Sequence, residues 1–440
     1  MQRRATQVGQ SWGRYPHLEH AGVRSVLWRS DPLPPLDRET KALPHAFGRS
    51  YGDSCLNGGG VLLDVAGLDR FIMLDEAADL LRCEAGVSLA RILDTIVPTG
   101  RFLPVLPGTS RVSVGGAIAN DIHGKNHHRA GTFGAQVTAF ELLRSSGERL
   151  LCTQEQNAEL FRATIGGLGL TGLILWAELR LSRIPGAGIA VERVRFPSLD
   201  AFFELSARDA EIEYAVAWID CLGRDANLGR GIYLRGEHTE LPGKAPLALQ
   251  RPALRVPFDA PRSLLNRWTL STFNAIYYHR APRTPGRSTV PYTEFFFPLD
   301  VVEDWNRLYG RSGFLQYQCV LPESEPDALR QILERIGRSG ELAGLAVLKR
   351  FGAFPRAGLL SFPRPGFTLA VDFGFRGDGT LVLLEDLDAI VRAVHGAVYP
   401  AKDARMSAES FRAFFPEWEH FRRHVDPRFS SSFWRRVTGA

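Results

Sequence analysis

No stretch of this chain approaches the roughly 18 consecutive apolar residues that a membrane-spanning helix needs. The N-terminal residues, MQRRATQVGQ, contain two arginines but no apolar run behind them, so we expect no secretory signal there. Internal repeats and low-complexity tracts are absent as well. We therefore expect a protein that is cytoplasmic or peripheral to a membrane, with no transmembrane segment.

Cysteine is scarce, and its spacing excludes the usual cysteine-based sites. The five cysteines lie far apart without a C-x-x-C pair, which argues against a disulfide framework or a zinc site and agrees with a reducing compartment. We also expect no histidine metal site. His123 and His127 are four residues apart, but Gly124 disfavours the helix that this spacing needs, and no set of carboxylate or cysteine partners recurs nearby.

Basic residues slightly outnumber acidic ones, which leaves a formal net charge of +5. Part of the excess lies near the C-terminus, in arginines that are scattered and match no nucleic-acid reader motif, so we expect no nucleic-acid partner. Such a basic face could meet a phosphate-bearing substrate or an anionic membrane surface, or it could be a solvated helix face. The arginines are Arg422, Arg423, Arg428, Arg435 and Arg436.

The length of 440 residues exceeds a single typical core, so two or three domains are expected. The pattern of apolar residues predicts an α+β fold with mixed sheets rather than a repeating βαβ array. The composition changes near Arg183–Gly186. We place a first domain over 1–186, a second over 187–396, and a C-terminal segment over 397–440 that returns to the first domain.

Several elements can be placed within these domains. In the second, the proline- and arginine-rich residues 241–290 lack periodicity and predict a long loop or lid. We expect strands within 61–74 and at 80–83, a helix over 88–97, a hairpin over 137–143 and 149–152, a helix over 157–164 and a strand over 173–181. Further on we expect antiparallel strands within 187–240 with a helix near 198–208, then a strand over 368–375 and a helix over 381–395.

One segment, residues 104–134, stands apart because six of its positions are glycine. Glycine lets the backbone approach a large ligand closely and turn with positive φ at little steric cost. Asn120, Asp121, His123 and Lys125 are interleaved with these glycines. So many bare amides and titratable groups predict a ligand cradle. The glycines are Gly108, Gly115, Gly116, Gly124, Gly131 and Gly134.

A second glycine-rich stretch lies upstream, where Gly48–Asp53 is followed by Asn57–Gly60. Consecutive backbone amides in such turns form anion-binding nests, and two nests suit a diphosphate held from both sides. Two ordinary glycine hairpins are the alternative. The G-x-G-x-x-G run Gly167–Gly172 follows a predicted helix and precedes a strand, the reverse of a Rossmann fingerprint, so we predict a tight turn there.

These motifs resemble those of flavoproteins of the vanillyl-alcohol-oxidase type, which carry a PCMH-type FAD-binding domain. The similar segments are Gly48–Asp53, Pro107–Thr109, Val114–Ala117 and Gly166–Gly172. Within that class, DIHGKNHH at Asp121–His128 resembles the signature of decaprenylphosphoryl-β-D-ribose 2′-oxidases. Similar segments at 316–318, 348–352, 362–366 and 399–405 extend the resemblance over nearly the whole chain.

The resemblance implies a two-domain PCMH-type fold with an antiparallel-sheet substrate domain. Many relatives attach the flavin covalently through a histidine in the first glycine turn; this chain has Tyr51 and Asp53 there, so we predict non-covalent FAD. The implied FAD contacts are Ala46, Phe47, Gly48, Arg49, Ser50, Tyr51, Gly52, Asp53, Ser54, Gly108, Ser113, Val114, Gly115, Gly116, Asn120, Asp121, Ile122, His123, Ile174 and Tyr399.

Lys402 is the strongest catalytic candidate, because a fixed ammonium stabilises the negative charge that a flavin gains on reduction. His123 could orient the flavin or help to remove a hydroxyl proton, or it could simply bond the backbone. Lys125 suits a substrate phosphate, with a capping or solvent role as the alternative. The expected substrate contacts are Lys125, Gln316, Gln318, Lys349, Thr368 and Lys402.

The implied reaction is oxidation of the 2′-hydroxyl of a polyprenylphosphoryl-β-D-ribose to the 2′-keto sugar, the first half of an epimerisation to an arabinose donor for glycan or cell-wall synthesis. A short-chain reductase would complete the second half, and the lipid-linked substrate allows peripheral membrane contact. Thr368 stands where an asparagine is usual in the family, and Ala370 stands where the family's drug-sensitive members carry a cysteine, which keeps open another polyol, a sugar lactone or a lipid as substrate. A non-catalytic flavin- or phospholipid-binding protein is the alternative from another class.

Overall fold

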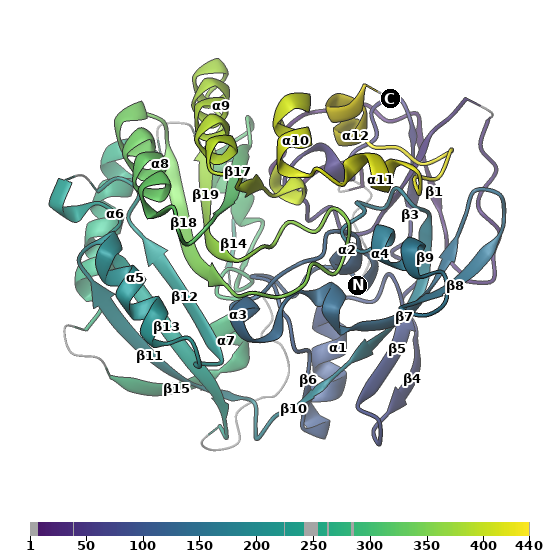
Figure 1. Ribbon diagram of the computed structural model, residues 1–440, viewed down its shortest axis with the longest axis horizontal. Coiled ribbons are helices and arrows are strands. Elements are labelled where there is room, and N and C mark those ends of the chain that lie inside the picture. The colour runs from purple at the N-terminus through teal and green to yellow at the C-terminus, as the bar shows by residue number, and fades with distance from the viewer. Residues whose placement is uncertain are drawn as a thin grey trace.

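A computed structural model describes residues 8–37, 39–223, 225–241, 254–261, 264–282 and 286–439. Figure 1 shows two halves side by side, one formed by the purple and blue N-terminal strands and the other by the teal and green strands that follow. Helices and antiparallel sheets are mixed, which confirms the predicted α+β class. In the described part of the chain, no helix is both long and apolar enough to cross a bilayer.

The first half contains two main sheets. Its elements are β1 Gly22–Ser25, β2 Ala42–His45, β3 Val61–Asp64, β4 Phe71–Asp75, β5 Leu80–Glu84, α1 Leu89–Ile96, β6 Arg101–Phe102, α2 Val114–Ala119, α3 His127–Ala130, β7 Val137–Leu143, β8 Arg149–Thr153, α4 Ala158–Thr164, β9 Leu173–Arg180 and β10 Ser182–Arg183. Strands β1, β3 and β2 pair in parallel, and β4-β5-β9-β7-β8 form an antiparallel sheet. Apolar residues of α1, spaced as one helical face, share a core with this sheet.

The second half is built on one large antiparallel sheet in the order β15-β11-β13-β12-β18-β19-β17-β20. Its elements are β11 Gly188–Phe196, α5 Leu199–Arg208, β12 Tyr214–Ile219, β13 Gly231–Thr239, β14 Leu254–Arg255, α6 Arg267–Arg280, β15 Arg287–Pro291, α7 Tyr292–Phe296, β16 Val302–Glu303, β17 Phe314–Leu321, α8 Pro326–Ser339, β18 Ala343–Phe351, β19 Gly366–Gly374, α9 Asp378–Ala393 and β20 Ala397–Val398. Buried side chains of α5, α8 and α9 share a core with the sheet. These three helices lie together on its outer side in Figure 1.

After β20 the chain crosses back to the first half, where the yellow helices of Figure 1 lie. These are α10 Ala408–Phe414, α11 Trp418–Arg422 and α12 Ser432–Thr438. The Ala42 amide donates to the Arg428 carbonyl, and the Ser430 amide donates to the Ala42 carbonyl. Arg436 of α12 forms an ion pair with Asp53 at 2.7 Å and another with Asp403 at 2.9 Å. The C-terminal helices therefore brace the wall that carries the first glycine turn.

Most expected elements lie where the sequence placed them, including the hairpin β7–β8, helix α4 and the strand β9 that follows Gly167–Gly172. The prediction of a long loop over 241–290 is wrong for its described residues, because they include α6 and the strands β14 and β15. Residues 242–253, 262–263 and 283–285 lie outside the described part. Helix α6 escaped prediction because its apolar residues are spread around the helix and form no single stripe.

Candidate active site

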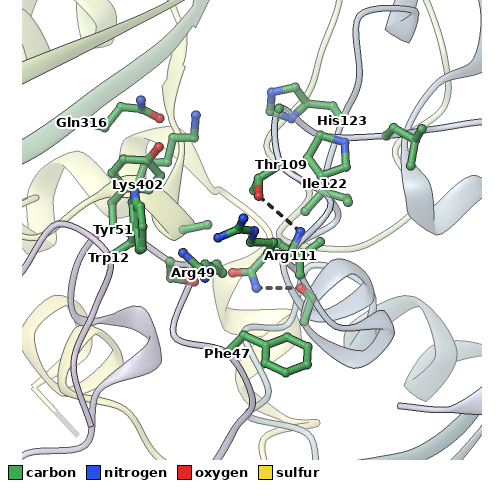
Figure 2. A pocket seen from close by; sticks show the side chains of 18 of the residues that line it. Trp12, Phe47, Arg49, Tyr51, Thr109, Arg111, Ile122, His123, Gln316 and Lys402 are labelled. Atoms are coloured by element: carbon green, nitrogen blue, oxygen red, sulfur yellow. Dashed lines mark hydrogen bonds between the residues drawn. The ribbon is translucent and has the colours of Figure 1, made fainter. Parts of the chain in front are cut away.

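A cavity of about 690 Å³ lies where the glycine turns of the first half meet β17, β18 and β19 of the second. Its volume falls within the range of small-molecule and cofactor sites, about 300–1,000 Å³. In Figure 2, Gln316, Lys402 and Tyr51 gather on one side of this cavity and His123 lies on the other. Both glycine-rich segments contribute to the wall, so residues far apart in sequence converge on one site.

Arg49 brings positive charge to the first glycine turn. Its guanidinium lies 4.2 Å from the ring centroid of Trp12, and its Nε is buried without a hydrogen-bond partner among the described residues. Burial and the nearby Arg111 lower the pKa of Arg49 to about 10, so the group remains cationic at neutral pH. A buried guanidinium with an unused donor fits an anionic ligand such as a phosphate.

The backbone beside Arg49 offers further donors. Gly48 has a φ of +58°, a left-handed conformation that favours glycine. The Tyr51 amide donates to the Ala401 carbonyl, whereas within the described chain the amides of Gly48, Arg49 and Ser50 donate to no protein acceptor. Three neighbouring amides on a cavity wall form a site for phosphate oxygens.

The second glycine-rich segment leaves room for a ligand. A Cβ added to Gly108 would meet no protein atom within 4 Å, and one added to Gly116 would meet only the Ser113 hydroxyl, at 3.0 Å. Both glycines line the cavity. The amide of Gly116 donates to Ser113 Oγ, and this hydrogen bond fixes the first turn of α2 without a ligand. The bare glycine surface and the unused donors near Arg49 fit the diphosphate and the ring system of FAD.

His123 and Gln318 meet across the cavity. Gln318 Nε2 lies 2.9 Å from His123 Nε2 and 3.0 Å from Thr368 Oγ1. His123 Nδ1 is buried and has no hydrogen-bond partner among the described residues. Burial, with Lys349, Lys402 and His127 nearby, lowers the pKa of His123 well below its usual value. The imidazole is therefore neutral and has one nitrogen left for a ligand.

Lys402 lies beside Tyr51, with Nζ 5.4 Å from the ring centroid. Burial lowers the pKa of Lys402, and the carboxylate of Asp372 opposes that shift. Asp372 is fully buried and accepts hydrogen bonds from Gln316 Nε2 and, at 3.5 Å, from the Tyr309 hydroxyl. Burial raises the pKa of Asp372. The two groups stabilise each other as an ammonium and a carboxylate.

Two more lysines line the same cavity. Lys125 Nζ donates to the Phe295 carbonyl and lies 4.4 Å from the centroid of that ring. Lys349 Nζ lies 3.5 Å from the Gly124 carbonyl. Burial lowers the pKa of each lysine to about 7, and Lys402 adds to the shift of Lys349. Within the described residues no lysine forms a salt bridge, so a bound anion would be their first counter-charge.

The rest of the wall is apolar and aromatic. It includes Val216, Leu234, Val290, Leu345 and Val347 from the large sheet. Aromatic rings at this wall come from Trp218, Phe273, Tyr277, Phe295 and Phe296. Phe295 and Phe296 are buried, and both also face the cavity. The cavity therefore combines a polar, cationic region with an apolar one.

Most predicted site residues converge on this cavity. Five do not line it, because they support the wall from behind. These five are Gly52, Asp53, Val114, Asp121 and Thr368. The residues that do line it are Ala46, Phe47, Gly48, Arg49, Ser50, Tyr51, Ser54, Gly108, Ser113, Gly115, Gly116, Asn120, Ile122, His123, Lys125, Ile174, Gln316, Gln318, Lys349, Tyr399 and Lys402.

Each of the five has a structural partner instead. Asp53 pairs with Arg436, and a Cβ on Gly52 would lie 1.8 Å from the Asp403 carbonyl. Asp121 accepts from Ser361 Oγ at 2.5 Å and from the Gly134 amide at 2.9 Å. The Val114 amide donates to the Val87 carbonyl. Thr368 is fully buried and holds Gln318.

The last part of the upstream glycine-rich stretch, Asn57–Gly60, does not face the cavity. Asn57 Nδ2 donates to the carbonyls of Lys41 and Val61, and the Gly58 amide donates to Ser432 Oγ. Arg435 of α12 donates to Asn57 Oδ1 at 2.8 Å. None of the four residues Asn57–Gly60 lines the cavity. This turn therefore locks the C-terminal helix onto the first half, and only the earlier part of the upstream stretch lines the cavity, together with the 104–134 segment.

Sequence reasoning missed several residues of the site. Trp12 supports Arg49, and Asp300 accepts from Thr109 Oγ1 and the Ser110 amide at 2.7 and 2.8 Å. Asp372 sits beneath Gln316, and Trp218 lines the apolar wall. None lies in one of the motifs named above. Asp372 lies on β19 and pairs in register with Gln316 of β17, a proximity that only the folded chain reveals.

Comparisons with known proteins agree with this geometry. Residues 36–153 match the family described as the FAD binding domain. The decaprenylphosphoryl-beta-D-ribose oxidase of Mycolicibacterium smegmatis is 38% identical, over 97% of this chain and 96% of its own length. A protein of Streptomyces coelicolor described as an uncharacterized protein in the mprA 5′ region is 35% identical over 80% of this chain and all of its own.

A more distant match covers less of the chain. The delta(24)-sterol reductase of Rattus norvegicus is 32% identical over 24% of this chain and 21% of its own length. The likeness to the ribose oxidase, in contrast, extends over both halves and the C-terminal helices. The cradle, the family match and this full-length likeness show that the chain belongs to the decaprenylphosphoryl-β-D-ribose oxidase family and is an FAD-dependent oxidoreductase that acts on CH–OH groups.

Proposed function

We propose that this protein oxidises the 2′-hydroxyl of a polyprenylphosphoryl-β-D-ribose to the 2′-keto sugar. The observation that carries the proposal is the make-up of the cavity outside the FAD cradle. One cavity combines polar side chains at Gln316 and Gln318, cationic lysines at Lys125 and Lys349, and an aromatic wall. A lipid-linked sugar phosphate needs all three: hydrogen bonds for the sugar, positive charge for the phosphate and apolar surface for the prenyl chain.

Lys125 and Lys349 are the proposed phosphate ligands. Burial lowers the pKa of both lysines to about 7, and no carboxylate among the described residues stabilises their charged forms. A phosphodiester bound between them would restore that stabilisation and keep both ammonium groups charged. The site is thus better suited to an anionic sugar derivative than to a neutral polyol or a sterol.

The first isoprene units of the lipid would lie along the aromatic wall. Phe295 and Phe296 are buried beneath Lys125, whereas Phe273 and Tyr277 stand at the exposed edge of the same cavity. All four rings line the same cavity, so we propose that the prenyl chain runs from the phosphate ligands toward its exposed edge. Apolar burial along that path would add binding free energy of roughly 25 cal/mol per Å².

Oxidation of the sugar removes a hydride from the carbinol carbon and a proton from its hydroxyl. FAD, when bound, supplies the hydride acceptor. His123 would take the proton at Nδ1 in the tautomer whose own proton lies on Nε2, which requires Gln318 to present Oε1 to that nitrogen; this imidazole is neutral, and its Nδ1 has no other partner in the described structure. Lys402 supplies fixed positive charge that favours the negative charge developing during the reaction.

We also propose that FAD is held without a covalent bond. Cys55 lines the cavity, but its thiol donates to the Ser50 and Gly52 carbonyls, and burial raises the pKa of the thiol to about 12. A protonated thiol is a poor nucleophile. Acid precipitation of the holoenzyme should therefore leave the yellow flavin in the supernatant; flavin that stays with the pellet contradicts non-covalent binding.

The keto product would remain attached to its lipid. A short-chain reductase that reduces the same carbon from the opposite face would then complete the epimerisation to the arabinose donor, and we propose such a partner. Both enzymes would meet their substrate at a membrane surface.

A donor panel tests the proposed reaction. Holoenzyme is mixed without oxygen with a short-chain prenylphosphoryl-β-D-ribose, its arabinose epimer, free ribose, a sugar lactone and a sterol. We expect the flavin absorbance to bleach with the ribosyl phosphodiester far faster than with the others. Faster bleaching by the lactone or the sterol would overturn the assignment, and Thr368 and Ala370, the two departures from the family pattern named above, would then explain the changed specificity.

A further inference from the structure

Helix α6 turns large apolar side chains away from the protein. Trp268 is 84% exposed, Phe273 57%, Ile276 51% and Tyr277 42%, and Leu264, just before the helix, is 51% exposed. We call these five residues the α6 face. A contiguous exposed apolar surface on a soluble protein marks an interaction site more often than isolated exposed residues do.

The inner side of α6 is held by polar contacts. Asn274 is buried and donates through Nδ2 to Asp220 Oδ1 at 2.8 Å. The Tyr278 hydroxyl donates to the Phe196 carbonyl at 3.3 Å, and Arg267 Nη2 donates to the Gly337 carbonyl at 3.1 Å. A surface helix normally points its apolar stripe inward and its polar side outward. Here much of that order is reversed, and specific hydrogen bonds hold the helix in the reversed orientation.

The charge within α6 and the described residues that flank it has one sign. Residues 264–282 contain no aspartate or glutamate, and Arg267 and Arg280 are both exposed. In sequence, the longer segment 251–290 contains seven arginines and only one acidic residue, Asp259; of these arginines, Arg255 pairs with Glu303 and Asp304, and Arg287 lies 3.7 Å from Glu237. The arginines are Arg251, Arg255, Arg262, Arg267, Arg280, Arg283 and Arg287. Exposed aromatic residues among arginines fit the interface of a bilayer that contains anionic lipid.

The α6 face continues into the cavity. Phe273 and Tyr277 belong to both, and their rings stack with centroids 6.0 Å apart. Tyr277 also packs edge-on against Trp218 of the cavity wall, with centroids 4.8 Å apart. A prenyl chain could therefore pass from a surrounding apolar phase into the cavity along one strip of aromatic rings.

We propose that the α6 face docks onto the interface of an anionic lipid bilayer and places the mouth of the cavity against the membrane. The inference rests on the proposed function in one respect only, because a lipid-linked substrate gives the docking its purpose. The docking itself depends on Trp268, Ile276 and the exposed Arg267 and Arg280 at the two ends of α6. It does not depend on the reaction.

Vesicle sedimentation tests the docking without any sugar donor. Holoenzyme is spun with vesicles of phosphatidylcholine alone or with added phosphatidylglycerol. We expect binding to the anionic vesicles that weakens with salt, and binding at least about tenfold weaker for the double variant Trp268→Ser/Ile276→Ser. Neither residue lines the cavity, so flavin content and bleaching by a soluble short-chain donor should stay as in the wild type.

A matched double variant, Trp28→Ser/Val382→Ser, removes a tryptophan and an aliphatic side chain of similar exposure, 54% and 61%, outside α6. It should bind vesicles like the wild type. Hydrogen exchange should also slow in α6 on vesicles. Equal binding by wild type and the α6 variant overturns the proposal, as does no binding by either. A wild-type dimer that the α6 variant converts to a monomer in light scattering also overturns it, because a second copy would then cover the face.

Docking and chemistry can fail separately. The vesicles contain no substrate, and the bleaching experiment with a short-chain donor contains no vesicles. Loss of docking with normal bleaching would leave the proposed reaction standing. Normal docking with no bleaching would leave the proposed docking surface standing and would contradict the proposed reaction.

Discussion

Gln318 Nε2 lies 2.9 Å from Nε2 of His123, a contact that links β17 of the second half to the glycine-rich loop of the first. In this orientation the amide nitrogen donates, so the imidazole proton sits on Nδ1. Rotation of the amide by a half-turn presents Oε1 to the imidazole instead and leaves the Nδ1 lone pair free. Gln318 therefore sets the tautomer of His123.

We expect Gln318→Met to slow flavin reduction by the sugar by about 10–100-fold, because it removes the group that sets the tautomer and leaves FAD binding intact. His123→Gln should be at least as slow and should lose any pH dependence that arises from the imidazole. Stopped-flow bleaching over a pH series measures both. A Gln318→Met enzyme with wild-type rate and pH profile would remove Gln318 from this role.

Lys402→Met should keep bound FAD yet reduce substrate turnover by about 10²–10³-fold, because a fixed positive charge is lost at the reacting groups. Because burial lowers the pKa of Lys402, its ammonium is lost at a lower pH than that of an ordinary lysine. The wild-type rate should thus decline on the alkaline side, and Lys402→Arg should move that decline to higher pH. Unchanged turnover in Lys402→Met would exclude the catalytic role.

Substrate binding should take up protons near pH 7. Lys125 and Lys349 have a pKa of about 7, so each is partly neutral in the free protein, and a bound phosphate raises both values. Affinity should fall as pH rises above about 7 for the same reason. Calorimetry in two buffers of different ionisation enthalpy counts the protons, and Lys125→Met should lower the count. Release of protons on binding would contradict this account.

Arg436→Leu should destabilise the fold by about 2–4 kcal/mol, because it leaves the buried Asp53 and Asp403 without their shared partner. The value is below that of a fully buried pair, since the Arg436 side chain is 26% exposed. Arg422→Leu, at an exposed position on α11, should change stability by less than about 0.5 kcal/mol. Urea unfolding of the two variants makes the comparison; equal stabilities would show that Asp53 has another role.

Local sequence patterns identified the parts of the site that glycine builds. The turn at Gly48–Tyr51 and the glycines Gly108 and Gly116 face the cavity because close backbone approach requires them, and that requirement is visible in the sequence. At Asn57–Gly60, in contrast, the same pattern forms a turn that accepts a hydrogen bond from Arg435 of α12. A glycine-rich turn looks alike in sequence whether a ligand or a distant helix fills its concave side.

Residues that reach the site through long-range contacts could not be identified from the sequence. Trp12 and Arg49 meet only after folding, and Asp300 reaches Thr109 across 191 positions. Helix α6 was hidden for a different reason: besides the apolar residues that it exposes, it carries Leu270, Ala275 and Tyr278 at half-buried positions, so its apolar residues form no single stripe in the sequence. Pattern rules rely on such a stripe, and α6 does not have one.

The most direct measurement is the isotope effect on flavin reduction. Holoenzyme is mixed without oxygen with short-chain prenylphosphoryl-β-D-ribose that carries deuterium at carbon 2′ or at carbon 3′, and flavin bleaching is followed by stopped flow. The account predicts slower bleaching with the 2′-deuterated sugar only, together with a keto group at that carbon. Bleaching that is slowed only by the 3′ label, or no bleaching at all, would contradict it.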